Sequence, residues 1–369
     1  MSSNLIARSN TGPPCSGAGA ALFRGVPAMD ELLLSLLRTP GISGCEERVR
    51  ALVESALPGG VAQESDAMGN LVATIGEGEE AILFCAHLDE IGFVVTEVRE
   101  DGFLRLRAVG GIDPRTVLGH VVRVVTEGGE RLGVLGVNPP HLMRDRAKEM
   151  KEVPRGDGAL PRRGGDESRR GGGPRLSRAR LRRPRKTALR RERPLPRGRA
   201  LDDRLGCWVL LRALERLQGE HFRKRLHFAF TVQEEVGLRG AEVLSRRMSL
   251  THVFAVDSAS AADYPHGLPR PESRGPGQGA CLRVLDNASI IPPAFTREIE
   301  ALAAREGIPL QIIFGGGGTD VGAFQYGGAR VMPLGIPLRY THAAVEMAHR
   351  ADVDATLDFV CALARKYGG

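Results

Sequence analysis

The sequence lacks any apolar run long enough to cross a membrane. A spanning helix needs about 18 or more consecutive apolar residues, and no run reaches that length although 42% of the residues are hydrophobic. Residues 1–28 are rich in Ser, Gly, Ala and Pro and lack the apolar core of a signal peptide. We therefore expect a soluble protein with a disordered extension over residues 1–28, a transit peptide being the alternative, and a first amphipathic helix from about Met29.

Cysteine is scarce and is not arranged in pairs. The chain of 369 residues holds six cysteines, none of them in C-x-x-C spacing. Cys85 and Cys207 lie among apolar residues, which is typical of reduced, buried thiols rather than of disulfides. This pattern favours a cytoplasmic protein, and the length is sufficient for two domains.

The basic net charge of +7 comes from one segment. Residues 155–199 hold sixteen arginines and Lys186 against four acidic residues, which leaves 34 basic and 40 acidic residues in the rest of the chain. The body of the protein is therefore mildly acidic.

The predicted secondary structure changes along the chain, from a β-rich part to a part in which strands and helices alternate. Ser43 and Glu46 have capping-box spacing, which predicts a helix start. Short β-rich runs separated by turns predict a mostly antiparallel meander or small barrel; they are 71–75, 81–86, 92–98, 103–109, 121–125 and 132–137. From Leu205 onward, strands alternate with helices, which predicts an α/β sheet covered on both faces. The expected strands there are 226–232, 253–256, 280–284, 310–314 and 330–334, and the expected helices are 205–217, 238–246, 296–306 and 353–367.

Acidic and imidazole side chains stand at the ends of apolar runs in the predicted α/β part. Open α/β sheets place their sites at the carboxyl ends of strands. Carboxylate oxygens and neutral imidazoles suit Zn, Co or Mn, and one carboxylate can bridge two ions about 3.5–4 Å apart. The candidate residues are His87, Asp202, Glu234, Glu235, Asp257 and His342.

Each of these residues also has a simpler explanation. His87 with Asp89 forms a His-x-Asp pair in which the acid can fix the tautomer of a metal-binding imidazole, or it is a core histidine with a local hydrogen bond. Glu234 and Glu235 follow a strand, so that one can bind a metal while the other takes a proton from a metal-activated water; most Glu-Glu pairs are merely solvated.

Other candidate features are weaker. Asp257 is also explained as a helix cap, and the Asp202-Asp203-Arg204 run as a turn with a surface ion pair. Residues 315–318 are four glycines without a following Gly-Lys-Ser/Thr, so backbone amides facing a substrate are favoured over nucleotide binding. We expect surface or structural roles for the remaining histidines, which are His120, His141, His221, His227, His252, His266 and His349.

In combination, these motifs resemble the tetrahedral, glutamyl-type aminopeptidases, a family of dinuclear co-catalytic metallopeptidases. The matching stretches are 86–92, 109–115, 138–143, 200–206, 233–240, 316–322 and 339–347. The resemblance implies a phosphorylase/hydrolase-like three-layer α/β/α catalytic domain, formed by 29–90 and 200–369, with an inserted β-rich, barrel-like dimerisation domain at 91–154. It also implies dodecameric homo-oligomers that trim short peptides.

The resemblance further implies a role for each candidate residue. His87 and Asp257 would each hold one of two divalent ions, Glu235 and His342 would hold the other, and Asp202 would bridge them. Glu234 would act as general base and acid, and Asp89 would orient His87. We expect hydrolysis of N-terminal residues from short peptides through a metal-bridged water.

The arginine-rich residues 155–199 do not fit the resemblance. They contain no Val, Ile, Phe, Tyr or Trp, so they cannot bury enough apolar surface to offset their ordering entropy, and we expect disorder. We interpret the segment as the product of two compensating frameshifts in a GC-rich gene. The alternatives are a solvated loop and a nucleic-acid-binding arm, which the lack of aromatic residues disfavours.

Two other functions remain as alternatives. One is a different dinuclear amidohydrolase, such as an N-acyl amino-acid deacylase, and the other is a nucleic-acid-binding protein acting through residues 155–199.

Overall fold

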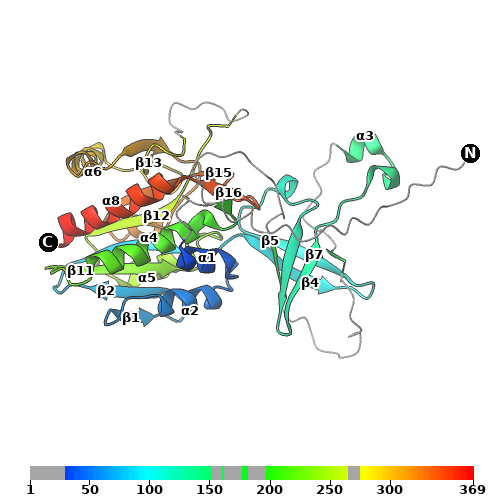
Figure 1. The fold of residues 1–369 in the computed structure, drawn as a ribbon, viewed down its shortest axis with the longest axis horizontal. Coiled ribbons are helices and arrows are strands. Elements are labelled where there is room, and N and C mark those ends of the chain that lie inside the picture. Colours follow the sequence, from blue (N-terminus) through cyan, green and yellow to red (C-terminus); the bar gives the residue numbers. More distant parts are fainter. Residues whose placement is uncertain (1–29, 151–159, 162–176, 182–196, 265–274) are drawn as a thin grey trace, which may run out of the picture.

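The computed structural model describes residues 30–150, 160–161, 177–181, 197–264 and 275–369 (Figure 1). The helices in these ranges are α1 Glu31–Arg38, α2 Glu47–Ser55, α3 Arg146–Glu149, α4 Leu201–Leu217, α5 Arg239–Arg247, α6 Pro293–Arg305, α7 Val321–Gln325 and α8 Arg350–Gly368. Two short 3-10 turns are η2 Pro114–Thr116 and η3 Pro140–Leu142.

The described strands form two sheets. Those of the larger sheet are β1 Ala62–Ser65, β2 Leu71–Ile75, β3 Ala81–His87, β10 Arg197–Gly198, β11 Arg225–Thr231, β12 His252–Ser260, β13 Ala280–Leu285, β14 Leu310–Phe314, β15 Arg330–Arg339 and β16 Glu346–Ala348. Those of the smaller sheet are β4 Gly92–Val98, β5 Phe103–Val109, β6 Val121–Thr126, β7 Gly129–Val134, β8 Leu160–Pro161 and β9 Ser177–Leu181.

The larger sheet is mixed, with parallel strands at its centre. Its order is β1-β2-β11-β3-β12-β15-β13-β14, and β11, β3, β12 and β15 run parallel. Every residue of β3 is buried, as expected for a parallel strand covered on both faces. Phe84 of β3 stacks between Phe228 and Phe254 of its two neighbours, with ring centroids 5.2 Å apart in both pairs.

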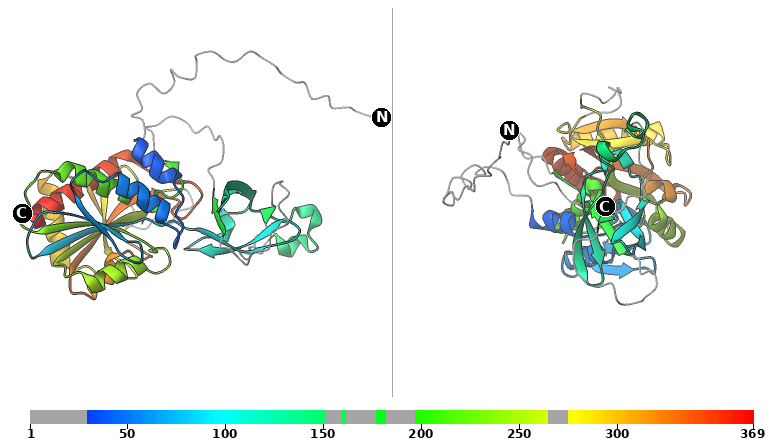
Figure 2. Two further views of the ribbon diagram at one scale, coloured as in Figure 1. Left: turned by 90° about the horizontal axis from the view of Figure 1, so that it is seen from below. Right: turned by 90° about the vertical axis from the view of Figure 1, so that its right-hand side faces the viewer.

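Helices cover both faces of this sheet, which confirms the predicted α/β class (Figure 2). Helix α4 packs on β3 and β12 and contacts α1 and α8, and these three helices form one layer. Helices α5 and α7 pack together on the opposite face. Within the described residues, no helix is both long and apolar enough to span a membrane.

The smaller sheet comes from the chain between β3 and α4 and extends away from the larger sheet (Figure 1). Its order is β7-β6-β9-β4-β5-β8, and every pairing in it is antiparallel. It has a core of its own, formed by Phe93, Val95, Leu104, Leu106, Val117, Val122, Val124, Leu135 and Ala344.

Two sequence expectations differ from the structure. Within residues 155–199, β8, β9 and β10 are extended strands rather than disordered chain, because backbone hydrogen bonding can supply the pairing; the rest of this segment, like residues 1–28, lies outside the described ranges. The prediction of a capping box at Ser43 and Glu46 is also wrong. Helix α2 begins after Glu46, whose side chain makes no capping bond, because Ser43 and Glu46 have other partners described below.

Candidate metal centre

The central parallel strands bring the candidate residues to one edge of the larger sheet. His87 is the last residue of β3, and Glu234 and Glu235 follow the end of β11. Asp257 lies in β12, on the other side of β3 from β11. Because the three strands run parallel, their carboxyl ends meet there. Asp202 reaches this edge from the start of α4.

Two groups of side chains share Asp202. In the first, Nε2 of His87 lies 3.3 Å from Oδ1 of Asp202 and 4.0 Å from Oδ1 of Asp257. In the second, Nε2 of His342 lies 3.5 Å from Oδ2 of Asp202 and 3.2 Å from Oε1 of Glu235. Within each group, one ligand atom of each member lies within 4.8 Å of the others. The two oxygens of Asp202 therefore face different groups.

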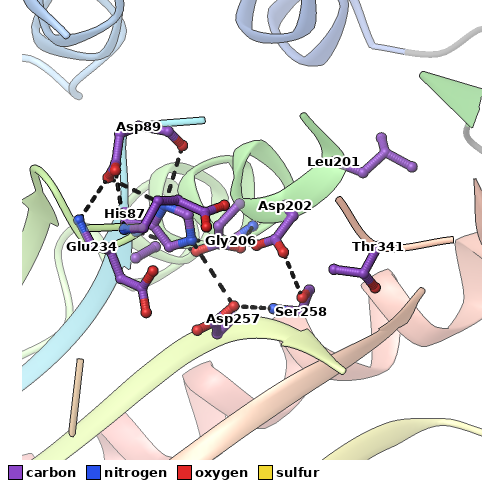
Figure 3. Close-up of polar contacts among 12 residues, drawn as sticks. His87, Asp89, Leu201, Asp202, Gly206, Glu234, Asp257, Ser258 and Thr341 are labelled. Carbon is purple, nitrogen blue, oxygen red and sulfur yellow. Dashed lines mark hydrogen bonds and ion pairs between the residues drawn. The ribbon is translucent and has the colours of Figure 1, made fainter. Parts of the chain in front are cut away.

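Asp202 is held from two sides by residues that the sequence analysis missed. Oγ of Ser258 donates to Oδ2 of Asp202 at 2.8 Å (Figure 3). Glu346, which is buried, accepts from the backbone N–H groups of Leu201, Asp202 and His342 at 2.7, 3.3 and 2.9 Å. Glu346 thus fixes the backbone at His342, which belongs to the second group, and at Asp202, which the two groups share.

Asp89 contacts His87 and the backbone of the two glutamates. Nδ1 of His87 lies 3.1 Å from the carbonyl oxygen of Asp89 and 3.4 Å from its Oδ1, so the pair is close as the sequence suggested. The carboxylate of Asp89 accepts from the backbone N–H groups of Glu234 and Glu235 at 3.0 and 3.1 Å. It therefore contacts both the imidazole and the turn that carries the glutamates (Figure 3).

Burial and like charges control protonation at the site. Burial, reinforced by the charge of Asp202, raises the pKa of Asp257 to about 7. Burial also raises the pKa of Glu235, and it raises that of Glu234 well above its ordinary value. Burial alone would lower the pKa of His342, but hydrogen bonds with Asp202 and Glu235 raise it to about 12. The carboxylates thus repel one another in a poorly solvated space.

This donor set fits divalent cations. Several carboxylates withdrawn from water are costly unless positive charge offsets them. Each group combines one imidazole with two carboxylates, which is a ligand set that zinc and other first-row divalent ions accept. The shared carboxylate of Asp202 can contribute one oxygen to each group.

The two groups open onto a cavity of about 630 Å³. Its wall also includes Glu234, which belongs to neither group, and the glycine run Gly315, Gly316, Gly317 and Gly318. The lining also includes the apolar side chains of Leu238, Ile313 and Phe314. This space is large enough for a small organic substrate.

The other histidines of the described residues stand apart from the two groups. His227 pairs with Thr74, the ring of His252 lies 4.4 Å from that of Tyr367, and His349 caps α8. His266 lies outside the described ranges. The simpler explanation of Asp202, Asp203 and Arg204 as an exposed turn is wrong because all three are buried.

The fold and this cluster together define a metal-dependent hydrolase. Residues 69–158 and 183–359 match the sequence model of the M42 glutamyl aminopeptidases, and the chain belongs to this family. The resemblance to the tetrahedral aminopeptidases is therefore confirmed, and with it the assignment as a metal-dependent aminopeptidase, a hydrolase of peptide bonds. Membership also implies divalent metal ions.

Curated relatives and solved structures agree with this assignment. The chain is 33% identical to a lysyl aminopeptidase of Pyrococcus furiosus, over 90% of this chain and 96% of the relative. It is 29% identical to a glutamyl aminopeptidase of Lactococcus lactis, over 87% and 90%. A TET peptidase structure from Pyrococcus horikoshii, described as assembling into a tetrahedron or a large octahedral shell, has a TM-score of 0.78 and 35% identity, over 90% of this chain and 98% of that chain.

Proposed function

We propose that this aminopeptidase removes N-terminal residues from short peptides with two divalent ions, Zn, Co or Mn, per subunit. His87, Asp257 and Asp202 would hold one ion, and Glu235, His342 and Asp202 the other. The observation that carries the proposal is the position of Asp202, whose two oxygens face the two groups. When bound, the ions would polarise the peptide carbonyl and acidify a water molecule.

Glu234 is proposed as the general base and acid. Its carboxylate lines the cavity beside both groups but belongs to neither, so it is free to exchange protons. It would accept a proton from the attacking water and return that proton to the leaving amine nitrogen. Burial raises its pKa well above the ordinary value, so the protonated form of this carboxyl group is more accessible than that of an exposed glutamate.

Asp89 is proposed to fix the orientation of His87 and of the turn before Glu234. Nδ1 of His87 lies near the carbonyl oxygen of Asp89. A hydrogen on Nδ1 would be donated to that oxygen, which would leave Nε2 without a hydrogen and free to bind an ion. Nε2 is the atom that faces Asp202 and Asp257.

The test is substitution of Glu234→Gln, with Glu54→Gln on the exposed face of α2 as the matched control. Glu234→Gln should keep two ions per subunit by metal analysis and lower kcat on aminoacyl anilides by at least about 100-fold, whereas Glu54→Gln should match the wild type. Turnover of the Glu234 variant at the wild-type rate would refute the mechanism. Activity on N-acylated instead of free-amine substrates would refute the aminopeptidase assignment.

We further propose that residues 91–154 form an inserted domain that joins subunits into a homo-oligomer, in a cytoplasmic enzyme. Exposed large apolar side chains gather on the strands and loops of the smaller sheet, and such patches are typical of interfaces. They are Val98, Phe103, Val121, Leu132, Val134, Val137 and Leu142. One solved relative at 35% identity is described as a dodecamer. A monomer in gel filtration of the metal-loaded protein would exclude this assembly.

A further inference from the structure

The backbone that carries the two site glutamates turns through an unusual conformation. Gln233, between the end of β11 and Glu234, has a φ of 56°. A residue with a side chain adopts this left-handed region only at an energetic cost, so surrounding contacts have to hold it there. The conformation determines where the next two side chains point.

Glu46, which precedes Gln233 by 187 residues in the sequence, supplies one of those contacts. Its Oε1 accepts from the backbone N–H of Gln233 at 3.1 Å and from that of Gly44 at 2.8 Å. The side chain is only 6% exposed, and burial together with the charge of Asp89 raises its pKa to about 7. A buried carboxylate at a helix start that does not cap the helix has no evident use in α2 itself.

Ser43 reaches the same turn through Asp89. Oγ of Ser43 donates to Oδ2 of Asp89 at 2.6 Å, and the carboxylate of Asp89 accepts from the N–H groups of Glu234 and Glu235. Three consecutive backbone N–H groups, of Gln233, Glu234 and Glu235, therefore each donate to a carboxylate oxygen. One of the two accepting carboxylates is that of Glu46. The other is that of Asp89, which Ser43 contacts.

We propose that Glu46 is a positioning residue of the active site, which holds the Gln233 turn so that Glu234 and Glu235 face the cavity. Ser43 supports the same turn by orienting Asp89. Both residues precede residue 69, where the match to the family's sequence model begins. The role in catalysis rests on the proposed function of Glu234, whereas the role in holding the turn does not.

The geometry distinguishes a hydrogen-bonding role from a charge role. Both N–H groups donate to the same oxygen, Oε1. A glutamine has an oxygen that can occupy this place, whereas an alanine has none. Glu46→Gln should therefore preserve the turn, and Glu46→Ala should release it. Glu54→Ala is the matched control, because Glu54 lies on the exposed face of α2.

The experiment has two readouts on the full-length chain. The first is hydrogen exchange of metal-free protein, measured by mass spectrometry that resolves single amides. We expect the amides of Gln233, Glu234 and Glu235 to exchange at least about 10-fold faster in Glu46→Ala than in the wild type, with Glu46→Gln and Glu54→Ala unchanged. The second is kcat of the metal-loaded protein, corrected for ion content. It should fall about 10-fold or more in Glu46→Ala with KM within about 2-fold, because small misplacements of catalytic groups are costly, and Glu46→Gln should restore it.

Three results would overturn the proposal. They are unchanged exchange at the turn in Glu46→Ala, equally accelerated exchange across the whole chain, and a Glu46→Gln variant as impaired as Glu46→Ala. If Glu46→Ala does not fold, Ser43→Ala takes its place, with faster exchange expected at Glu234 and Glu235 and unchanged exchange counting against the proposal. A wild-type protein without aminopeptidase turnover would remove the proposed function, while the exchange data would still decide whether Glu46 holds the turn.

Discussion

Removal of the divalent ions should make the stability of the protein fall as the pH rises. The effect arises from buried carboxylates whose pKa values are raised in the folded state. Burial and the charge of Asp202 raise the pKa of Glu346 to about 8, and burial raises that of Asp257 to about 7, from ordinary values of 4.5 and 3.8. In the unfolded chain, both groups lose their protons near pH 4.

The sign follows from the protons bound by each state. Between pH 5 and pH 7, folded protein without metal retains protons on Glu346 and Asp257 that the unfolded chain has released. The free energy of unfolding therefore falls by about 1.4 kcal/mol per pH unit for each such group. Over two pH units the two groups together amount to about 5 kcal/mol, slightly less than the full sum because Asp257 begins to lose its proton as the pH approaches 7. The raised pKa of His342 acts in the same direction above about pH 6.5.

The assay is differential scanning calorimetry at pH 5, 6 and 7, with and without a chelator. For a chain of 369 residues, the unfolding entropy of about 2 cal/mol/K per residue converts about 5 kcal/mol into a decrease in Tm of about 7 °C. Zinc- or manganese-loaded protein should show the opposite trend, because the ligands bind metal in their deprotonated forms.

A metal-free protein whose Tm is constant or increases from pH 5 to pH 7 would refute this reasoning. It would mean that the carboxylates at the site are ionised in the folded state even without a cation. A parallel fall in the metal-loaded protein would point to titrating groups elsewhere in the chain.

Three further predictions concern the site, the core and the gene. His342→Ala should lower the metal content from two ions to one per subunit, because His342 belongs to only one of the two groups; metal analysis after dialysis measures this. Phe84→Ala should cost about 4 kcal/mol of stability and about 5 °C in Tm, since its ring is fully buried between two others. Resequencing the gene across codons 150–202 should reveal one insertion or deletion at each end of the arginine-rich segment.

Each of these three has a contradicting outcome. Retention of two ions by His342→Ala would remove that residue from the metal centre. A loss of less than about 1 kcal/mol in Phe84→Ala would mean that the core between β11, β3 and β12 can collapse around the change. An unchanged reading of codons 150–202 would show that the arginine-rich segment is genuine.

Most of the α/β part was predictable from local patterns. The apolar run 310–314 coincides with β14. The bounds of the expected strand 226–232 differ by one residue from those of β11, and the expected strand 253–256 covers the first part of β12. Strands buried on both faces are continuous apolar runs, so their positions are visible in sequence. β16 was missed because it is three residues long, with Glu346 at its start.

The residues that support the site were less visible. Ser43 and Glu46 match a capping box, but their hydrogen bonds go to Asp89 and Gln233 instead. Glu346 is an ordinary acidic residue in sequence, and only the return of β16 to β15 brings it under Asp202 and His342. Apart from Glu346 and His342, which are four residues apart, these partners are separated by tens to hundreds of residues along the chain, and local patterns carry no information about them.

The sequence by itself determined the fold class, the candidate ligands and their family, because side-chain periodicity and strand-end chemistry are local properties. Tertiary structure alone decided that Asp202 lies between two ligand groups, that the Asp89 carboxylate accepts from the backbone of Glu234 and Glu235, and that Glu46 reaches the same turn. These contacts join segments that become neighbours only when parallel strands align their carboxyl ends, and that alignment is a property of the whole sheet.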